Sequence, residues 1–220
     1  NPPVTFGNQM ADNIKERLDF SFGVTTDSGV KISTADIVSL RVIDQPVQYD
    51  KLGNQTKDPY RVKVTNVENA VYARHVGATD NDKVVAYLTP SNSLPEKYEL
   101  YIAGPGGAIA PADLSGLFQD TAYTSIALTW LDTQNTRDMS SMFSGCIDLI
   151  RLDLGDNFDT GNVTNMKGMF FRCMELTHLD LGNKFNTQNV TNMDYMFYRC
   201  ANLYSLNLEG NFNTAAVSSM

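Results

Sequence analysis

The sequence predicts an α+β chain in two parts. Residues 1–108 are expected to form an all-β, sandwich-like domain, and residues 109–220 a solenoid of repeats, each a helix plus a short strand. Two observations carry this prediction. The first part holds short alternating stretches rich in Val, Tyr, Phe and Ile, and the second part repeats with a period of 27 residues, as Met139, Met166 and Met193 show. A period of roughly 20–50 residues is typical of repeat architectures.

The first part contains six stretches that are typical of strands. They are RLDFSFGV, IVSLRVI, YRVKVTNV, AVYARHV, KVVAYLT and KYELYIA. Each is enriched in β-branched and aromatic residues, and turn signals such as TTDSG and TPSNSLPE separate them. This pattern favours an antiparallel sandwich, with an immunoglobulin-like topology as one possibility. The region contains no Cys and no Trp, so the hallmarks of an antibody domain are absent.

An apolar stripe predicts a helix in each repeat. Its members recur at steps of three and four residues, as on one face of an α-helix: Val163, Met166, Met169, Phe170 and Cys173. Thr160 and Asn162 stand just before the stripe, and we expect them to cap the start of the helix because both residue types favour that position.

The stretch LTHLDL at residues 176–181 predicts a short strand after the helix. Its alternation places Leu179 and Leu181 inward and His178 and Asp180 outward. One repeat alone cannot bury enough apolar surface to offset the entropy lost on ordering its chain. The repeats must therefore stack, with equivalent side chains in contact.

The period also sets the expected boundaries. A capping repeat is expected at residues 112–131, complete repeats at 132–158, 159–185 and 186–212, and a truncated repeat at 213–220. The capping repeat keeps Leu114, Leu117 and Phe118 but has Thr121 in the position of the cysteine. Because the chain stops at Met220, early in a further repeat, we expect the natural protein to continue.

The repeat consensus resembles a known family. The strings DTGNVTNMKGMFFRCMELTHLDL and NTQNVTNMDYMFYRCANLYSLNL, and less fully DTQNTRDMSSMFSGCIDLIRLDL, are similar to the BspA-type leucine-rich repeat of bacterial surface proteins. The resemblance covers residues 112–220. It implies a leucine-rich-repeat solenoid in a surface-displayed, non-enzymatic protein used for adhesion, with no catalytic residues to transfer.

Charge and composition exclude several function classes. The net charge of −8 argues against nucleic-acid partners, and no apolar run reaches the roughly 18 residues of a membrane span, so we expect no membrane insertion of this fragment. The three cysteines, spaced 27 residues apart, are expected to be buried free thiols. The sequence holds no HExxH or GxSxG motif, and we expect no enzyme activity, metal or cofactor.

One acidic pair leaves room for an alternative. Asp153 and Asp180 occupy equivalent outward positions and would repel each other on adjacent strands. A shared calcium ion is one way to relieve the repulsion, but calcium needs six to eight oxygens. Solvation, or pairing with Arg151, is the favoured interpretation.

These observations favour a bacterial cell-surface, extracellular binding protein. We expect a monomer that recognises an extracellular protein or glycan through the solenoid surface. The candidate binding residues on the exposed strand face are Arg151, Asp153, His178, Asp180, Tyr204 and Asn207. A second candidate patch combines aromatic and Arg character, which is typical of contact hot spots, in Arg172, Tyr198 and Arg199 beside Phe171.

Two alternatives stay open. In one, the N-terminal β-domain is a carbohydrate-binding or accessory module and the repeats are a passive spacer. In the other, the outward residues of the repeats serve only solubility.

Overall fold

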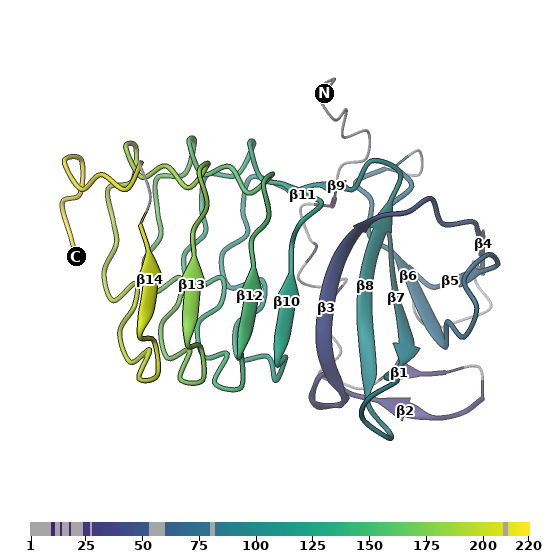
Figure 1. Cartoon of the computed structure of the whole chain (residues 1–220). Helices are drawn as coiled ribbons and strands as arrows, with labels where there is room; N and C mark the ends of the chain where they lie inside the picture. The colour runs from purple at the N-terminus through teal and green to yellow at the C-terminus, as the bar shows by residue number, and fades with distance from the viewer. Residues whose placement is uncertain are drawn as a thin grey trace. The chain divides into compact units, whose positions relative to one another are not determined.

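The computed structural model (Figure 1) describes residues 10, 11, 14, 18, 24–26, 28–52, 60–79, 82–208 and 211–220. The chain folds as two compact units, Asn1–Ile109 and Ala110–Met220. Apart from one short 3-10 helix, the elements with defined bounds are all strands. The α+β class expected from the sequence is therefore wrong, and the chain is all-β.

Unit 1 contains nine strands and the 3-10 helix among its described residues. In chain order they are β1 (Val24–Thr25), β2 (Lys31–Ile32), η1 (Thr34–Asp36), β3 (Ile37–Asp44), β4 (Tyr49–Lys51), β5 (Val62–Val64), β6 (Tyr72–His75), β7 (Val85–Pro90), β8 (Tyr98–Gly104) and β9 (Ala108–Ile109). Four of them form its main sheet in the order β3-β8-β7-β6, and β1-β2 and β4-β5 form separate antiparallel pairs.

The main sheet of unit 1 is mixed. Strands β6, β7 and β8 pair antiparallel, whereas β3 and β8 run parallel, with Leu40 opposite Leu100. Parallel neighbours need a crossover connection, which the intervening β4–β7 segment supplies. The expectation of a purely antiparallel sandwich is therefore wrong, because alternation within a stretch carries no information on which stretch lies beside it.

The core of unit 1 lies around β7 and β8. Val85, Ala86, Tyr87 and Leu88 are consecutive in β7 and all buried, so this strand is covered on both faces. One side of the sheet packs against Val47 and its neighbours in a cluster. A strand covered on both sides is expected to be a continuous apolar run, which matches VVAYL in the sequence.

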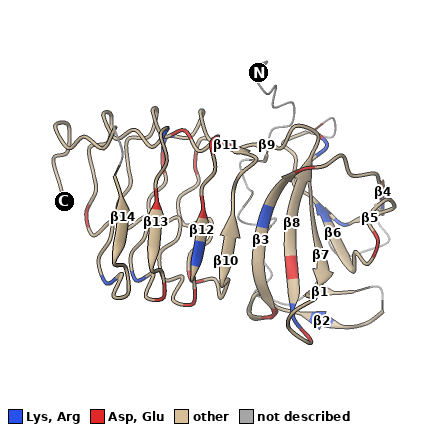
Figure 2. Cartoon of the chain, viewed as in Figure 1, with Lys and Arg blue, Asp and Glu red and all other residues tan. Residues whose placement is uncertain are grey.

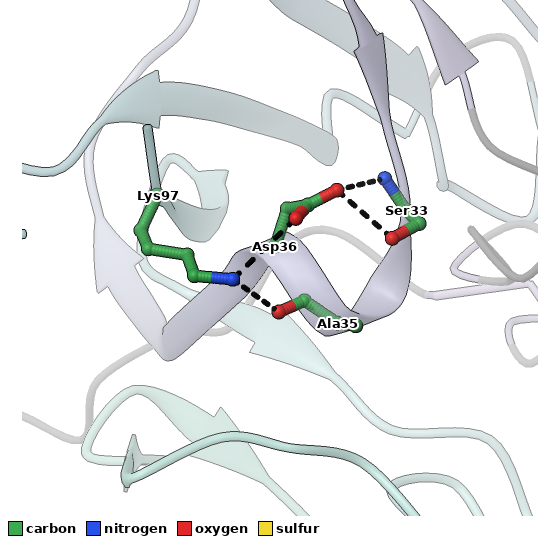
Figure 3. A network of polar contacts seen from close by, with 4 residues as sticks. All are labelled: Ser33, Ala35, Asp36 and Lys97. Carbon is green, nitrogen blue, oxygen red and sulfur yellow. Dashed lines mark hydrogen bonds and ion pairs between the residues drawn. The ribbon is translucent and has the colours of Figure 1, made fainter. Parts of the chain in front are cut away.

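A polar network fixes the start of η1 (Figure 3). The Ser33 N–H and hydroxyl both donate to Asp36 Oδ2, each at 2.9 Å. Lys97 Nζ donates to the Ala35 carbonyl at 3.0 Å and pairs with Asp36 Oδ1 at 3.4 Å. The hydrogen bonds from Ser33 are the main cause that lowers the pKa of Asp36, and Lys97 adds to it. The network ties the turn before β3 to the residue before β8.

Unit 2 contains five short strands. They are β10 (Ser125–Ala127), β11 (Leu131–Asp132), β12 (Arg151–Asp153), β13 (His178–Asp180) and β14 (Ser205–Asn207), and the pairs β10–β12 and β13–β14 are parallel. Strands β10, β12, β13 and β14 stand in a row (Figure 1), and Leu179 pairs with Leu206 in the β13–β14 register. Further parallel bridges join Asp138, Asn165, Asn192 and Ser219 in succession. Equivalent positions of consecutive repeats therefore lie side by side.

The helix expected at the apolar stripe is absent. Among the described residues of unit 2 there is no α-helix, and the stripe runs through a series of turns. Every second N–H leaves the local chain: Met166, Gly168, Phe170 and Arg172 donate to carbonyls of the next repeat. Of the residues between them, Met169 bonds Met166 and Phe171 bonds Gly168, each three positions back, and the Lys167 N–H bonds Asn165 Oδ1. The helix-plus-strand leucine-rich-repeat solenoid is therefore wrong.

The physical reason lies in the competition for backbone donors. An α-helix uses every N–H in a bond to the residue four positions back. In this unit half of those donors join adjacent repeats instead, as strands do. The stripe residues are still buried, Val163 and Phe170 each at 0% exposure. The spacing of apolar residues at steps of three and four thus predicted correctly which side chains are buried, but it did not predict the backbone conformation.

Two further expectations concern the same repeat. Thr160 and Asn162 cap no helix; the Thr160 hydroxyl donates to the Asn186 carbonyl at 2.9 Å, and Asn162 Nδ2 donates to the Gln134 carbonyl at 2.8 Å. Both side chains bond to a neighbouring repeat. The inward and outward sides of LTHLDL are confirmed, since Leu179 and Leu181 are buried and His178 is exposed.

Candidate functional site

The strand face of unit 2 carries the first set of predicted residues on β12, β13 and β14. Arg151, His178 and Tyr204 are all exposed. The His178 and Tyr204 rings meet edge to face with centroids 4.4 Å apart, and His178 Nδ1 lies 3.0 Å from the Thr177 hydroxyl. The structure therefore brings His178 and Tyr204 into contact.

The acidic residues of this face shape turns. Asp153 Oδ1 accepts the Gly155 N–H at 3.0 Å, and Asp180 Oδ1 accepts the Gly182 N–H at 2.9 Å. Asn207 Nδ2 also reaches Asp180 Oδ1, at 3.3 Å. Acidic residues stand at the ends of β12 and β13 in Figure 2. Within the described residues no three His, Cys, Asp or Glu side chains are grouped so that they could hold a metal ion.

The second predicted patch lies on the turns that follow the apolar stripe. The Phe171 and Tyr198 rings stack, with centroids 5.5 Å apart and planes inclined by 14°. The Arg199 guanidinium carbon lies 5.6 Å from the centre of the Tyr198 ring, and Arg172 is exposed. Sequence reasoning missed Tyr195, which is 60% exposed and meets Tyr198 edge to face at 5.8 Å. We call these five residues, Phe171, Arg172, Tyr195, Tyr198 and Arg199, the turn-edge patch.

Three residues of this patch have left-handed backbone. The φ angles are 60° at Arg172, 57° at Tyr195 and 61° at Arg199. The left-handed region costs an L-residue roughly 1–2 kcal/mol, which Gly avoids.

The same two turn positions are left-handed in every repeat. The first column holds Gly116, Ser141, Gly168 and Tyr195, and the second holds Asp120, Gly145, Arg172 and Arg199. Gly, Asp and Ser are small residues, and the first two are common in this conformation. A signal for Tyr195 was therefore present in the sequence: a large residue replaces Gly168 and Ser141 of the preceding repeats.

A groove opens beside the turn-edge patch. It has a volume of about 440 Å³ and is lined by residues of three successive turns, among them Asp120, Gly145, Asp148, Phe171 and Arg172. Gly145 has no side chain to fill it, and a Cβ atom there would meet the Asp120 carboxylate. The groove therefore lies between Asp120, next to Gly145, and Arg172 of the following repeat.

The three cysteines form a column in which Cys146 and Cys173 are buried and Cys200 is partly exposed. Cys146 donates to the Phe118 carbonyl at 2.9 Å, Cys173 to Phe143 at 3.2 Å and Cys200 to Phe170 at 3.0 Å. Thr121, in the cysteine position of the first turn, bonds its own Phe118 carbonyl at 2.9 Å. Burial raises the pKa of Cys146 to about 11. The thiols thus join repeats, and the thiol of Cys146 is held in its unreactive protonated form.

No helix among the described residues is both long and apolar enough to cross a bilayer.

Comparison with known proteins gives a match for one part of the chain. Residues 112–220 match a family described as "Mycoplasma protein of unknown function, DUF285". No curated protein and no solved structure matches the chain. The expected membership of the BspA-type leucine-rich-repeat family is therefore not supported, since the matching family is a different one and the repeats lack the helix that the prediction required.

Proposed function

We propose that this chain is a non-enzymatic bacterial cell-surface protein that binds an extracellular macromolecule through the turn-edge patch of unit 2. It acts as a monomer in this proposal, and the ordered row of repeats serves to present the patch. Repeated units give an extended, rigid surface, which suits recognition of a large partner.

One observation carries the proposal. Arg172, Tyr195 and Arg199 keep large side chains in left-handed backbone, where Gly168 and Gly145 stand in other repeats. Each costs roughly 1–2 kcal/mol relative to a relaxed backbone. Arg172, Tyr195 and Arg199 are exposed, so burial in the core of their own repeat does not repay this cost. Strained backbone that persists without a folding benefit points to a functional surface.

The residue types agree with a contact surface. Tyr and Arg are enriched among the residues that carry most of the binding energy at interfaces. The stack of Phe171 on Tyr198, with Arg199 over the Tyr198 ring, presents these groups in a fixed arrangement. A fixed arrangement reduces the entropy lost when a partner binds.

The experiment replaces the three strained residues by Gly. The full chain and its Arg172→Gly/Tyr195→Gly/Arg199→Gly variant are compared for binding to immobilised extracellular-matrix proteins and to a glycan array. Gly is compatible with left-handed backbone, so the variant is expected to fold. Retained binding by the variant would contradict the proposal.

A matched control addresses the strand face. Tyr204→Ser and His178→Ser remove the edge-to-face pair of that face and leave the turn-edge patch intact. Binding that survives this change but not the Gly variant supports the turn edge. The opposite result moves the function to the strand face, and loss with neither variant supports the passive-spacer alternative.

The alternative of a sugar-binding N-terminal domain gains no support from its aromatic pair. Tyr87 and Tyr101 stack with centroids 5.2 Å apart, but Tyr87 is buried and belongs to the core cluster against which Tyr101 packs. An aromatic platform for sugars must face solvent, so this pair serves packing.

A further inference from the structure

The groove beside the turn-edge patch lies where the column of left-handed residues changes its side chains. The second column carries Arg172 and Arg199 in the two later repeats, whereas the first complete repeat has Gly145, and the Asp120 carboxylate lies where a side chain at Gly145 would begin. The groove, of about 440 Å³, lies within the roughly 300–1,000 Å³ that is usual for small-molecule sites.

Polar groups around the groove are available to a ligand. The Asp148 carboxylate and the Arg172 guanidinium have no hydrogen-bond or ion-pair partner in the part of the chain that the structure describes, and both are exposed. Asp120 accepts only a long bond of 3.3 Å, from Gln119 Nε2. Two carboxylates and one guanidinium therefore line the groove, next to a hydroxyl at Thr121.

One wall is aromatic. Phe171 lines the groove, and its ring is held in place by stacking on Tyr198 at 5.5 Å. The face of an aromatic ring carries partial negative charge. It therefore attracts the C–H bonds of a sugar ring, which carry partial positive charge.

We propose that this groove binds a neutral sugar ring of a glycan, with the C–H face of the sugar against Phe171 and its hydroxyl groups bonded to Asp148, Asp120 and Arg172. The inference rests on the proposed function, because Phe171 and Arg172 belong to the turn-edge patch, and it names the chemical class of the partner.

The charge of the groove decides between classes of glycan. Asp120 and Asp148 outnumber Arg172 in the lining, so the groove is negative. Carboxylates accept hydrogen bonds from sugar hydroxyls, and charge-assisted bonds are the stronger kind. Sialylated and sulfated sugars carry negative charge of their own, which the carboxylates of Asp120 and Asp148 repel.

The test uses the full chain on a glycan array that carries neutral, sialylated and sulfated oligosaccharides, followed by titration with the neutral sugars that bind. We expect binding to neutral sugars. Asp148→Asn should weaken it about 10- to 100-fold, since one charge-assisted hydrogen bond is lost. Asp156→Asn is the matched control, an exposed Asp of the same repeat that does not line the groove, and it should change nothing.

A second variant tests whether the shape of the groove matters. Gly145→Ala places a methyl group against Asp120 and should also abolish sugar binding, while a circular-dichroism melt checks that the variant folds. No binding to any sugar, binding only to sialylated or sulfated sugars, or neutral-sugar binding that Asp148→Asn leaves unchanged would each overturn the inference.

The two proposals fail separately. Binding to a matrix protein that is lost in the triple Gly variant, together with no binding to any neutral sugar, overturns the sugar site and supports the proposed function. Sugar binding that depends on Asp148 but survives replacement of Tyr195 and Arg199 supports the groove and contradicts the wider patch.

Discussion

The rings of Phe143 and Phe170 stack nearly parallel, with centroids 5.5 Å apart and planes inclined by 2°. Phe118 and Phe197 extend the stack on either side, at 5.6 and 5.5 Å. Phe118, Phe143 and Phe170 are buried. Each ring contacts the equivalent ring of the next repeat. The rings therefore form a continuous column through the interior of unit 2, and this column helps to set the distance between repeats.

Replacing a ring in this column should be costly. Phe170→Ala removes the contacts to both neighbouring rings and leaves a cavity, so we expect a loss of about 3–5 kcal/mol in the free energy of unfolding. Urea denaturation of the full chain measures it. Phe171→Ala, at the adjacent half-buried position, is the control and should cost clearly less. Equal losses for the two variants would show that the column is not what holds the repeats together.

A buried hydroxyl makes a second contact between repeats. Thr160 is fully buried, and its Oγ1 donates to the Asn186 carbonyl and accepts the Asn186 N–H at 2.7 Å. Thr160→Val keeps the shape but leaves both Asn186 groups unpaired, so we expect a loss of about 1–3 kcal/mol. Thr160→Ser retains the hydroxyl and should recover most of the stability. Thermal unfolding of the two variants decides; a Val variant as stable as the Ser variant would contradict this role.

The sequence predicted burial better than backbone. The period of 27 residues correctly placed Leu179 opposite Leu206, because equivalent side chains must meet when repeats stack. The same letters could not reveal that the N–H groups of Met166 and Gly168 bond to the next repeat. A turn series and a helix can bury the same positions, so apolar spacing does not separate them.

The candidate binding surface, too, could be predicted from the sequence only in part. The aromatic and Arg residues of the sequence indicated Arg172, Tyr198 and Arg199 as surface residues, but the groove beside Gly145 becomes visible only when the successive turns are assembled in space. In unit 1, alternation identified strands but gave no information that β3 lies parallel to β8.

The network at η1 predicts a pH dependence. The hydrogen bonds from Ser33, with Lys97 in support, lower the pKa of Asp36 below the ordinary value of 3.8. A group whose folded-state pKa is lowered stabilises the fold above its unfolded pKa, and this contribution is lost as the pH falls through the folded-state value. Asp36→Asn should therefore reduce the stability at pH 7 by about 1 kcal/mol and leave it nearly unchanged at a pH below both the folded-state and the unfolded-state pKa.

Urea denaturation at several pH values measures this difference. The double variant Asp36→Asn/Lys97→Met separates the contribution of Lys97 from that of Ser33. A difference between wild type and Asp36→Asn that is constant across the pH range would contradict the electrostatic account.

The residues with strained backbone predict that one substitution can weaken binding without lowering the stability of the fold. Tyr195→Gly relieves roughly 1–2 kcal/mol of backbone strain but gives the unfolded chain more freedom, which costs about 0.4–1 kcal/mol. We expect the stability to stay level or rise by about 1 kcal/mol, while binding falls. Lys167→Gly, an exposed position without left-handed backbone, should lose stability instead. Equal losses at the two positions, by thermal unfolding, would show that Tyr195 is not strained.

The thiol column predicts an order of chemical reactivity. Cys146 is fully buried and its pKa is raised to about 11 by burial, so at pH 8 only about one molecule in a thousand carries the reactive thiolate there. The neighbouring Cys200 and then burial raise the pKa of Cys173, whereas Cys200 is only partly buried. Iodoacetamide should therefore modify Cys200 first, and Cys146 only after unfolding in urea, as mass spectrometry of the peptides can show. Because the pKa of Cys146 is higher in the folded state than the ordinary value of 9.0 for a thiol, the fold should also lose stability as the pH rises from that value towards 11. Early modification of Cys146 in the native protein would mean that the repeats open at the Phe118 carbonyl that this thiol bonds.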